Sequence, residues 1–138
     1  MSVAMNVVYA GDLKCRATHL PSGSVIETEA PVDNGGKGEA FSPTDLVGAA
    51  LASCALTVMG IVARRQGIDI RGAAARVIKE MVATPTRRIG TLTVAVTMPA
   101  GIQVSAEDRS RLENAVAACP VKKSLHPDIN LHFDIVWP

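Results

Sequence analysis

Aromatic side chains are scarce in this chain of 138 residues, which contains two Phe, one Tyr and one Trp. Proteins that bind single-stranded nucleic acid need aromatic surfaces for base stacking beside a basic groove. The chain also lacks an excess of one charge, because 14 Lys and Arg side chains face 13 Asp and Glu for a net charge of +1. Its basic residues come only in isolated pairs, which are too short for a nucleic-acid patch. We therefore expect neither nucleic acid nor an anionic membrane surface as a partner.

Cysteine is sparse as well, with three residues and no CxxC pair. An odd number without paired spacing argues against a disulfide-stapled secreted scaffold, a thioredoxin-type motif and a structural zinc site. The first residues lack a basic segment followed by an apolar one, so no secretory signal is evident. We expect a cytoplasmic protein without a metal or other cofactor.

The chain has the length of one ordinary domain, and its hydrophobic content of 48% is ample for a core. Neither an internal repeat nor a linker interrupts it. The sequence therefore predicts a single domain spanning residues 1–138.

A long uncharged run extends from Leu46 to Ala63. Its length is at the lower edge of a membrane span, but alanine, serine, threonine and glycine dilute it. We interpret it instead as a helix buried on all sides, because a helix that is apolar all round has no face for water. A domain this small has difficulty surrounding such a helix alone, so burial predicts a dimer.

The start of this helix has a clear sequence signature. Ser42 is a favourable cap, Pro43 suits the first helical position, and the Asp45 carboxylate can bond back to the cap amide. The helix is expected to continue to about Gln66 and to end at Gly67.

The rest of the chain alternates between apolar and polar residues in a strand-like pattern. Three short strands with tight turns are predicted before residue 30, the last of them at 24–29, and residues 33–38 form a glycine-rich loop. Segments 70–83 and 89–98 are expected to pair as a hairpin, and residues 130–137 form a last strand. A second helix is expected to begin at Ser105. The fold class is therefore α+β.

Cys54 and Cys119 are the candidate reactive residues. Both are expected on inward helix faces, where they could meet, and Pro120 would make Cys119 the cap of a new turn whose free amides lower the pKa of its thiol. One thiol of such a pair can be oxidised by a peroxide to a sulfenic acid, which the second converts to a disulfide. Alternatively, the two cysteines are separate core residues, a common role that we assign to Cys15.

Other nucleophilic schemes are less well supported. A cysteine hydrolase needs an oriented histidine base, and His126 is the only histidine near Cys54 or Cys119 in sequence. If Cys54 reacts inside an apolar helix, a positive charge must offset its burial. Residues one turn away along that helix cannot supply it.

The chain resembles the OsmC/Ohr family of osmotically inducible and organic hydroperoxide resistance proteins. The resemblance rests on the Ser-Pro-Thr-Asp-Leu segment at 42–46, the Ser-Cys pair at 53–54 and the Ala-Cys-Pro-Val segment at 118–121. It implies an α+β fold in which antiparallel sheets wrap around central helices and two chains intertwine as a homodimer. It also implies thiol-dependent reduction of organic hydroperoxides in oxidative stress defence. In that reaction Cys54 would be the peroxidatic cysteine, which attacks the hydroperoxide, and Cys119 the resolving cysteine, which forms the disulfide. A dithiol reductant such as a lipoyl protein would then restore the two thiols.

In relatives an arginine and a glutamate activate the reactive sulfur. Here Thr44 occupies the place of that glutamate, and Asp45 is the nearest carboxylate. The candidate cations are Lys14, Arg16 and Lys37. This departure leaves an alternative function, in which the same fold is a non-catalytic dimer that senses redox state or binds a small hydrophobic ligand.

Overall fold

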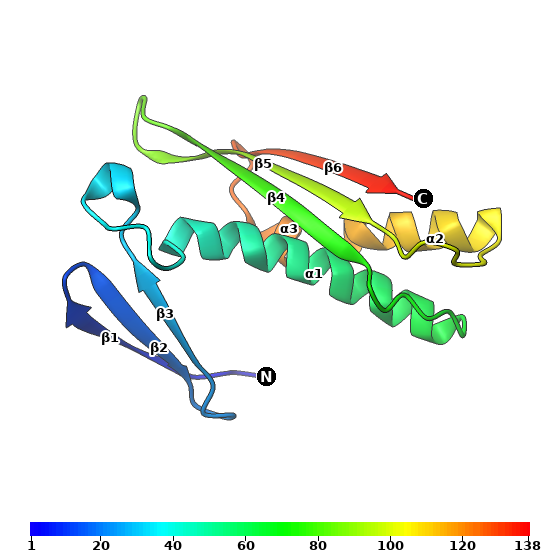
Figure 1. Cartoon of the computed structure of the whole chain (residues 1–138), viewed down its shortest axis with the longest axis horizontal. Coiled ribbons are helices and arrows are strands. Elements are labelled where there is room, and N and C mark those ends of the chain that lie inside the picture. Colours follow the sequence, from blue (N-terminus) through cyan, green and yellow to red (C-terminus); the bar gives the residue numbers. More distant parts are fainter. The chain divides into compact units, whose positions relative to one another are not determined.

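The computed structural model describes all 138 residues, which fall into two units, Met1–Val47 and Gly48–Pro138. Figure 1 follows the chain from one end to the other. The boundary between the units lies inside the long helix α1 (Pro43–Arg65). Each unit is described by itself.

The first unit is built on a three-stranded antiparallel sheet, in the order β1-β2-β3. Its strands are β1 (Met5–Gly11), β2 (Lys14–His19) and β3 (Val25–Glu29), followed by the short 3₁₀ helix η1 (Val32–Asn34). The three strands predicted before residue 30 are confirmed. Apolar side chains of β1 remain open to solvent, with Val7 and Val8 65% and 63% exposed, so this sheet carries uncovered apolar surface.

The capping box at the start of α1 is confirmed. The Asp45 backbone amide donates to Ser42 Oγ at 3.1 Å, and the Ser42 amide donates to Asp45 Oδ2 at 2.8 Å. At the other end Gly67 has a φ of 68°, the Ile68 amide bonds the Ala63 carbonyl and the Gly67 amide bonds the Arg64 carbonyl. This pattern is a Schellman motif, which explains why the helix ends at the predicted glycine.

The second unit contains the sheet β4-β5-β6, made of β4 (Ala74–Val82), β5 (Arg88–Thr97) and β6 (Asn130–Val136). β4 and β5 pair antiparallel, which confirms the predicted hairpin. β6 pairs with β5 in parallel, so this sheet is mixed and not wholly antiparallel as expected. A parallel neighbour requires a crossover connection, and the helical segment between β5 and β6 provides it (Figure 1).

The core of this unit lies between the central strand β5 and one face of α1. Leu92, Val94 and Val96 of β5 are fully buried, and Leu51, Ala55 and Met59 recur on the helix at the spacing of a single face. Gly48 lets the helix approach closely, because a Cβ atom there would lie 3.3 Å from Val77 Cγ1.

The single chain does not bury α1 on all sides, as expected for a domain too small to surround such a helix alone. Only six of its 23 residues are buried, and Ile61 is 46% exposed. By length and hydropathy α1 passes the test for a membrane span, but 33% of its most apolar window is buried, and core helices of soluble proteins pass the same test. One apolar helix face therefore lacks a partner in the single chain.

The connection between β5 and β6 carries the second cysteine. It consists of α2 (Ala106–Ala115), the 3₁₀ turn η2 (Val116–Ala118) and the short helix α3 (Pro120–Ser124). Ser105 caps α2 as predicted, by accepting a bond from the Asp108 amide at 3.0 Å. Leu112, Val116 and Cys119 are buried along one stripe, so the inward face predicted for this segment is confirmed.

Replacing Leu92 by Ala should lower the free energy of unfolding by about 2–5 kcal/mol, because Leu92 is 0% exposed and its removal leaves a cavity. The matched control is Ile78→Thr on β4, which keeps a β-branched residue at a position that is 49% exposed. We expect the control to cost less than about 1 kcal/mol. Urea denaturation followed by circular dichroism measures both, and equal losses would contradict this assignment of the core.

Candidate functional site

The structure brings the thiols of Cys54 and Cys119 together. Cys54 lies on α1 beside the buried residue Ala55 and is half-buried, whereas Cys119 is 0% exposed at the junction of η2 and α3. The Cys54 side chain is close enough to affect the titration of the Cys119 thiol, and both cysteines are free thiols. Residues 65 positions apart in the sequence thus form one pair.

Cys119 caps α3, as predicted from the adjacent Pro120. Its Sγ accepts a hydrogen bond from the backbone amide of Lys122 at 3.4 Å, and Pro120 occupies the first turn, where no amide hydrogen is needed. The chain turns at this point because a residue before proline avoids helical geometry, and the φ and ψ of Cys119 are −57° and 116°.

The expected lowering of the Cys119 pKa is wrong in direction. Burial raises the pKa of the Cys119 thiol most, the hydrogen bond with Cys54 raises it further, and the backbone amides of Lys122 and Val121 oppose the change. Loss of solvent disfavours a thiolate more than two amides of a five-residue helix can favour it. Cys119 is therefore a protonated thiol at neutral pH.

The ammonium of Lys122 is directed to an aromatic ring. Its Nζ lies 5.4 Å from the ring centroid of Phe133 on β6, a cation–π contact, while only its backbone amide bonds the Cys119 sulfur. Lys122 thus connects α3 both to the thiol pair and to the sheet.

The supporting cations predicted from the sequence lie in the first unit. Lys14 on β2 forms an ion pair with Glu39 at 3.3 Å, and the hydrogen bond and charge of Glu39 raise the pKa of its ammonium. Arg16 is exposed on the same strand, and Lys37 is exposed in the loop after η1. The two cysteines lie in the second unit, so a role beside Cys54 stays a prediction for each of these cations.

Thr44 and Asp45 take part in the cap of α1. Asp45 exchanges the two capping bonds with Ser42, and Thr44 Oγ1 lies 3.1 Å from Ser42 Oγ. The structure therefore gives both residues a local role in starting the helix that carries Cys54. A further role at the sulfur stays a prediction.

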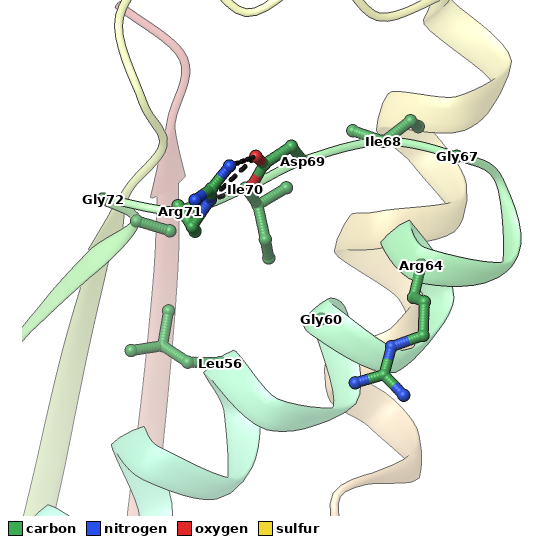
Figure 2. A pocket seen from close by; sticks show the side chains of 10 residues that line it. Leu56, Gly60, Arg64, Gly67, Ile68, Asp69, Ile70, Arg71 and Gly72 are labelled. Atoms are coloured by element: carbon green, nitrogen blue, oxygen red, sulfur yellow. Dashed lines mark hydrogen bonds and ion pairs between the residues drawn. The ribbon is translucent and has the colours of Figure 1, made fainter.

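A pocket of about 590 Å³ lies beside α1. Neither Cys54 nor Cys119 is among its lining residues. Figure 2 shows Leu56 of the helix and Ile70 of the returning segment pointing into the space between them. Asp69 and Arg71 form an exposed ion pair at its edge, with a shortest N–O distance of 2.6 Å. No group of three or more His, Cys, Asp or Glu residues converges to hold a metal ion in the structure.

A family model described as OsmC-like protein matches residues 36–134, a span that includes both cysteines. The chain belongs to this family. A comparison with curated proteins gave no match.

Solved structures agree with this OsmC-like assignment. A protein of Psychrobacter arcticus 273-4, described as an osmotic stress induced and detoxification response protein, is 47% identical, with 96% of this chain and 94% of that chain covered and a TM-score of 0.88. An organic hydroperoxide resistance protein OsmC of Legionella pneumophila is 15% identical over 98% and 96% of the two chains, with a TM-score of 0.75. OhrB of Bacillus subtilis, an organic hydroperoxide resistance protein, is 17% identical over 99% and 98%, with a TM-score of 0.68. The last two likenesses show the fold, which confirms the predicted α+β class.

The sequence reasoning missed Glu29, a buried carboxylate of this OsmC-like chain. Glu29 is 1% exposed and accepts hydrogen bonds from the backbone amides of Lys37 at 3.1 Å and Glu39 at 2.9 Å. Gly36 is required in this loop, because a Cβ there would lie 1.5 Å from the Ala30 carbonyl oxygen. An acidic residue at the end of a strand, directly before a glycine-rich loop with free amides, was the available signal.

Replacing Glu29 by Gln should destabilise the protein at neutral pH and make little difference in acid. The two backbone hydrogen bonds to its carboxylate lower the pKa of Glu29, so its stabilisation is present above the ordinary glutamate pKa and is lost as pH falls through the lowered value. Denaturation of both proteins between pH 7 and pH 3 measures the difference. A difference that stays constant over this range would contradict the role of the charged carboxylate.

Proposed function

We propose that this OsmC-like protein is a thiol-dependent peroxidase that reduces organic hydroperoxides and acts in the defence against peroxide stress. Family membership supports the general role, because fold relatives include proteins named for organic hydroperoxide resistance. The proximity of Cys54 to Cys119 carries the proposal of this specific reaction. It brings together the two thiols that a disulfide cycle needs.

In the proposed cycle the Cys54 thiolate attacks the distal oxygen of a hydroperoxide. An S–O bond forms, the O–O bond breaks, and the alkoxide leaves as an alcohol after taking up a proton. Cys119 then loses its proton and attacks the oxidised sulfur, so that an S–S bond forms and the hydroxyl group leaves as water. The sum is two thiols and one hydroperoxide giving a disulfide, an alcohol and water.

The unequal environments of the two thiols support this division of roles. Cys54 is half-buried, which suits the thiol that meets the substrate, whereas Cys119 is fully buried and keeps its proton because its pKa is raised. Leu51 and Met59 on α1 are fully buried, so of the apolar residues near Cys54 on that helix the half-buried Val58 is left to favour an alkyl or lipid-like hydroperoxide over hydrogen peroxide. A dithiol reductant, such as a lipoyl protein, returns the disulfide to two thiols.

The active form in this proposal is a cytoplasmic homodimer in which residues 1–138 act as a single domain. The exposed apolar side chains of β1 and the uncovered apolar face of α1 support association of two chains. One of Lys14, Arg16 and Lys37 then supplies the positive charge at Cys54, with Thr44 or Asp45 in the place of the activating carboxylate.

A redox-sensing or ligand-binding dimer is the second candidate. Thr44 favours it, because a hydroxyl in place of a carboxylate cannot fix a cation through an ion pair. A sensor of this kind would be oxidised once by a hydroperoxide and would not turn over.

Steady-state reduction of cumene hydroperoxide with a dithiol reductant tests the proposal. We expect Cys54→Ser to abolish turnover, because the attacking sulfur is lost, and Cys119→Ser to leave Cys54 as a sulfenic acid that a dimedone probe traps. Cys15→Ser is the matched control and should turn over like the original protein. One stoichiometric oxidation without turnover would favour the sensor. Two free thiols after treatment with excess hydroperoxide would exclude both.

A further inference from the structure

Lys122 makes two contacts at the start of α3. Its backbone amide donates to Cys119 Sγ at 3.4 Å, and its Nζ lies 5.4 Å from the Phe133 ring centroid. Phe133 is fixed in β6, where it pairs with Val94 of the buried central strand. One residue therefore connects the resolving thiol to the rigid part of the second unit.

α3 has little else to hold it in place. It has five residues, none of them buried, and a helix of this length is unstable by itself. Lys123 and Ser124 are exposed, and only Val121 and Lys122 are half-buried. Burial holds Cys119 itself in the core, and the few contacts that tie α3 to its surroundings decide how the Cys119 side chain is directed at the start of that helix.

We propose that Lys122 is a positioning residue, whose ammonium on the Phe133 ring holds α3 so that Cys119 is directed at Cys54 when the disulfide closes. The inference rests on the proposed function, in which Cys119 resolves oxidised Cys54. Lys122 acts through geometry, because its charged end is over the ring and only its amide bonds the sulfur. Loss of a partly buried cation–π contact should lower the equilibrium constant for forming the Cys54–Cys119 disulfide by about threefold to tenfold.

The test is the equilibrium between the full-length protein and glutathione redox buffers, with the Cys54–Cys119 disulfide quantified by peptide mapping. No hydroperoxide is involved, so the result is independent of peroxidase turnover. Lys122→Met should lower the equilibrium constant for the disulfide by about threefold to tenfold, whereas Lys122→Arg keeps a cation on the ring and should restore it. Lys123→Met is the matched control, because it removes the neighbouring charge from the same helix and should have no effect.

Phe133→Leu separates the contact from a simple effect of charge, since it keeps the lysine and removes the ring. It should reproduce the Lys122→Met result, and the double variant should be no worse than either single variant. Thermal unfolding of each variant reveals any general loss of stability, which would not change the ratio of disulfide to thiols in protein that remains folded.

The inference is overturned if Lys122→Met forms the disulfide as readily as the original protein, if Lys123→Met is equally impaired, or if no Cys54–Cys119 disulfide forms at all. Failure of the proposed function has a different signature. In that case the Cys54–Cys119 disulfide forms in the glutathione redox buffer, and its equilibrium constant falls in Lys122→Met. The original protein nevertheless does not turn over cumene hydroperoxide.

Discussion

The proximity of a fully buried thiol to a half-buried one is the interaction on which the proposed chemistry of this chain depends. Burial raises the pKa of Cys119, and its hydrogen bond to Cys54 raises it further, so the two sulfurs are chemically unequal although both are cysteines. In a two-thiol cycle this inequality separates the group that meets the substrate from the group that completes the disulfide.

The helix α1 is central because it combines a packing face with a reactive residue. Its buried face packs against the central strand of the second sheet, with Gly48 permitting close approach to Val77, and Cys54 lies beside that face. A thiol in the middle of the face would be inaccessible, and one on the opposite side would not reach Cys119. Ile61 of α1 and the apolar side chains of β1 remain exposed.

A second ordered region surrounds Glu29, whose carboxylate binds two backbone amides of the loop that leads to α1. Buried charges are normally found with such hydrogen bonds, because an unpaired carboxylate in a dry environment is costly. The loop contains Lys37 and is tightly packed at Gly36, so a single buried carboxylate orders the chain just before the capping box at Ser42. The two features together define how the long helix begins.

The sequence by itself determined the local structure of this protein: the capping box at Ser42, the glycine stop at Gly67, the β4–β5 hairpin, the cap at Cys119 and the family to which the motifs point. These features depend on residues close together in the chain, where spacing and backbone preference decide the outcome. Only the tertiary structure decided that β6 is parallel to β5, that one face alone of α1 is buried, that Glu29 is enclosed, and that burial raises the Cys119 pKa against the effect of its cap. The direction of β6 depends on how the connection crosses the sheet, and the other three features depend on how much solvent is excluded by segments far apart in the sequence. Periodicity along one element contains no information about either.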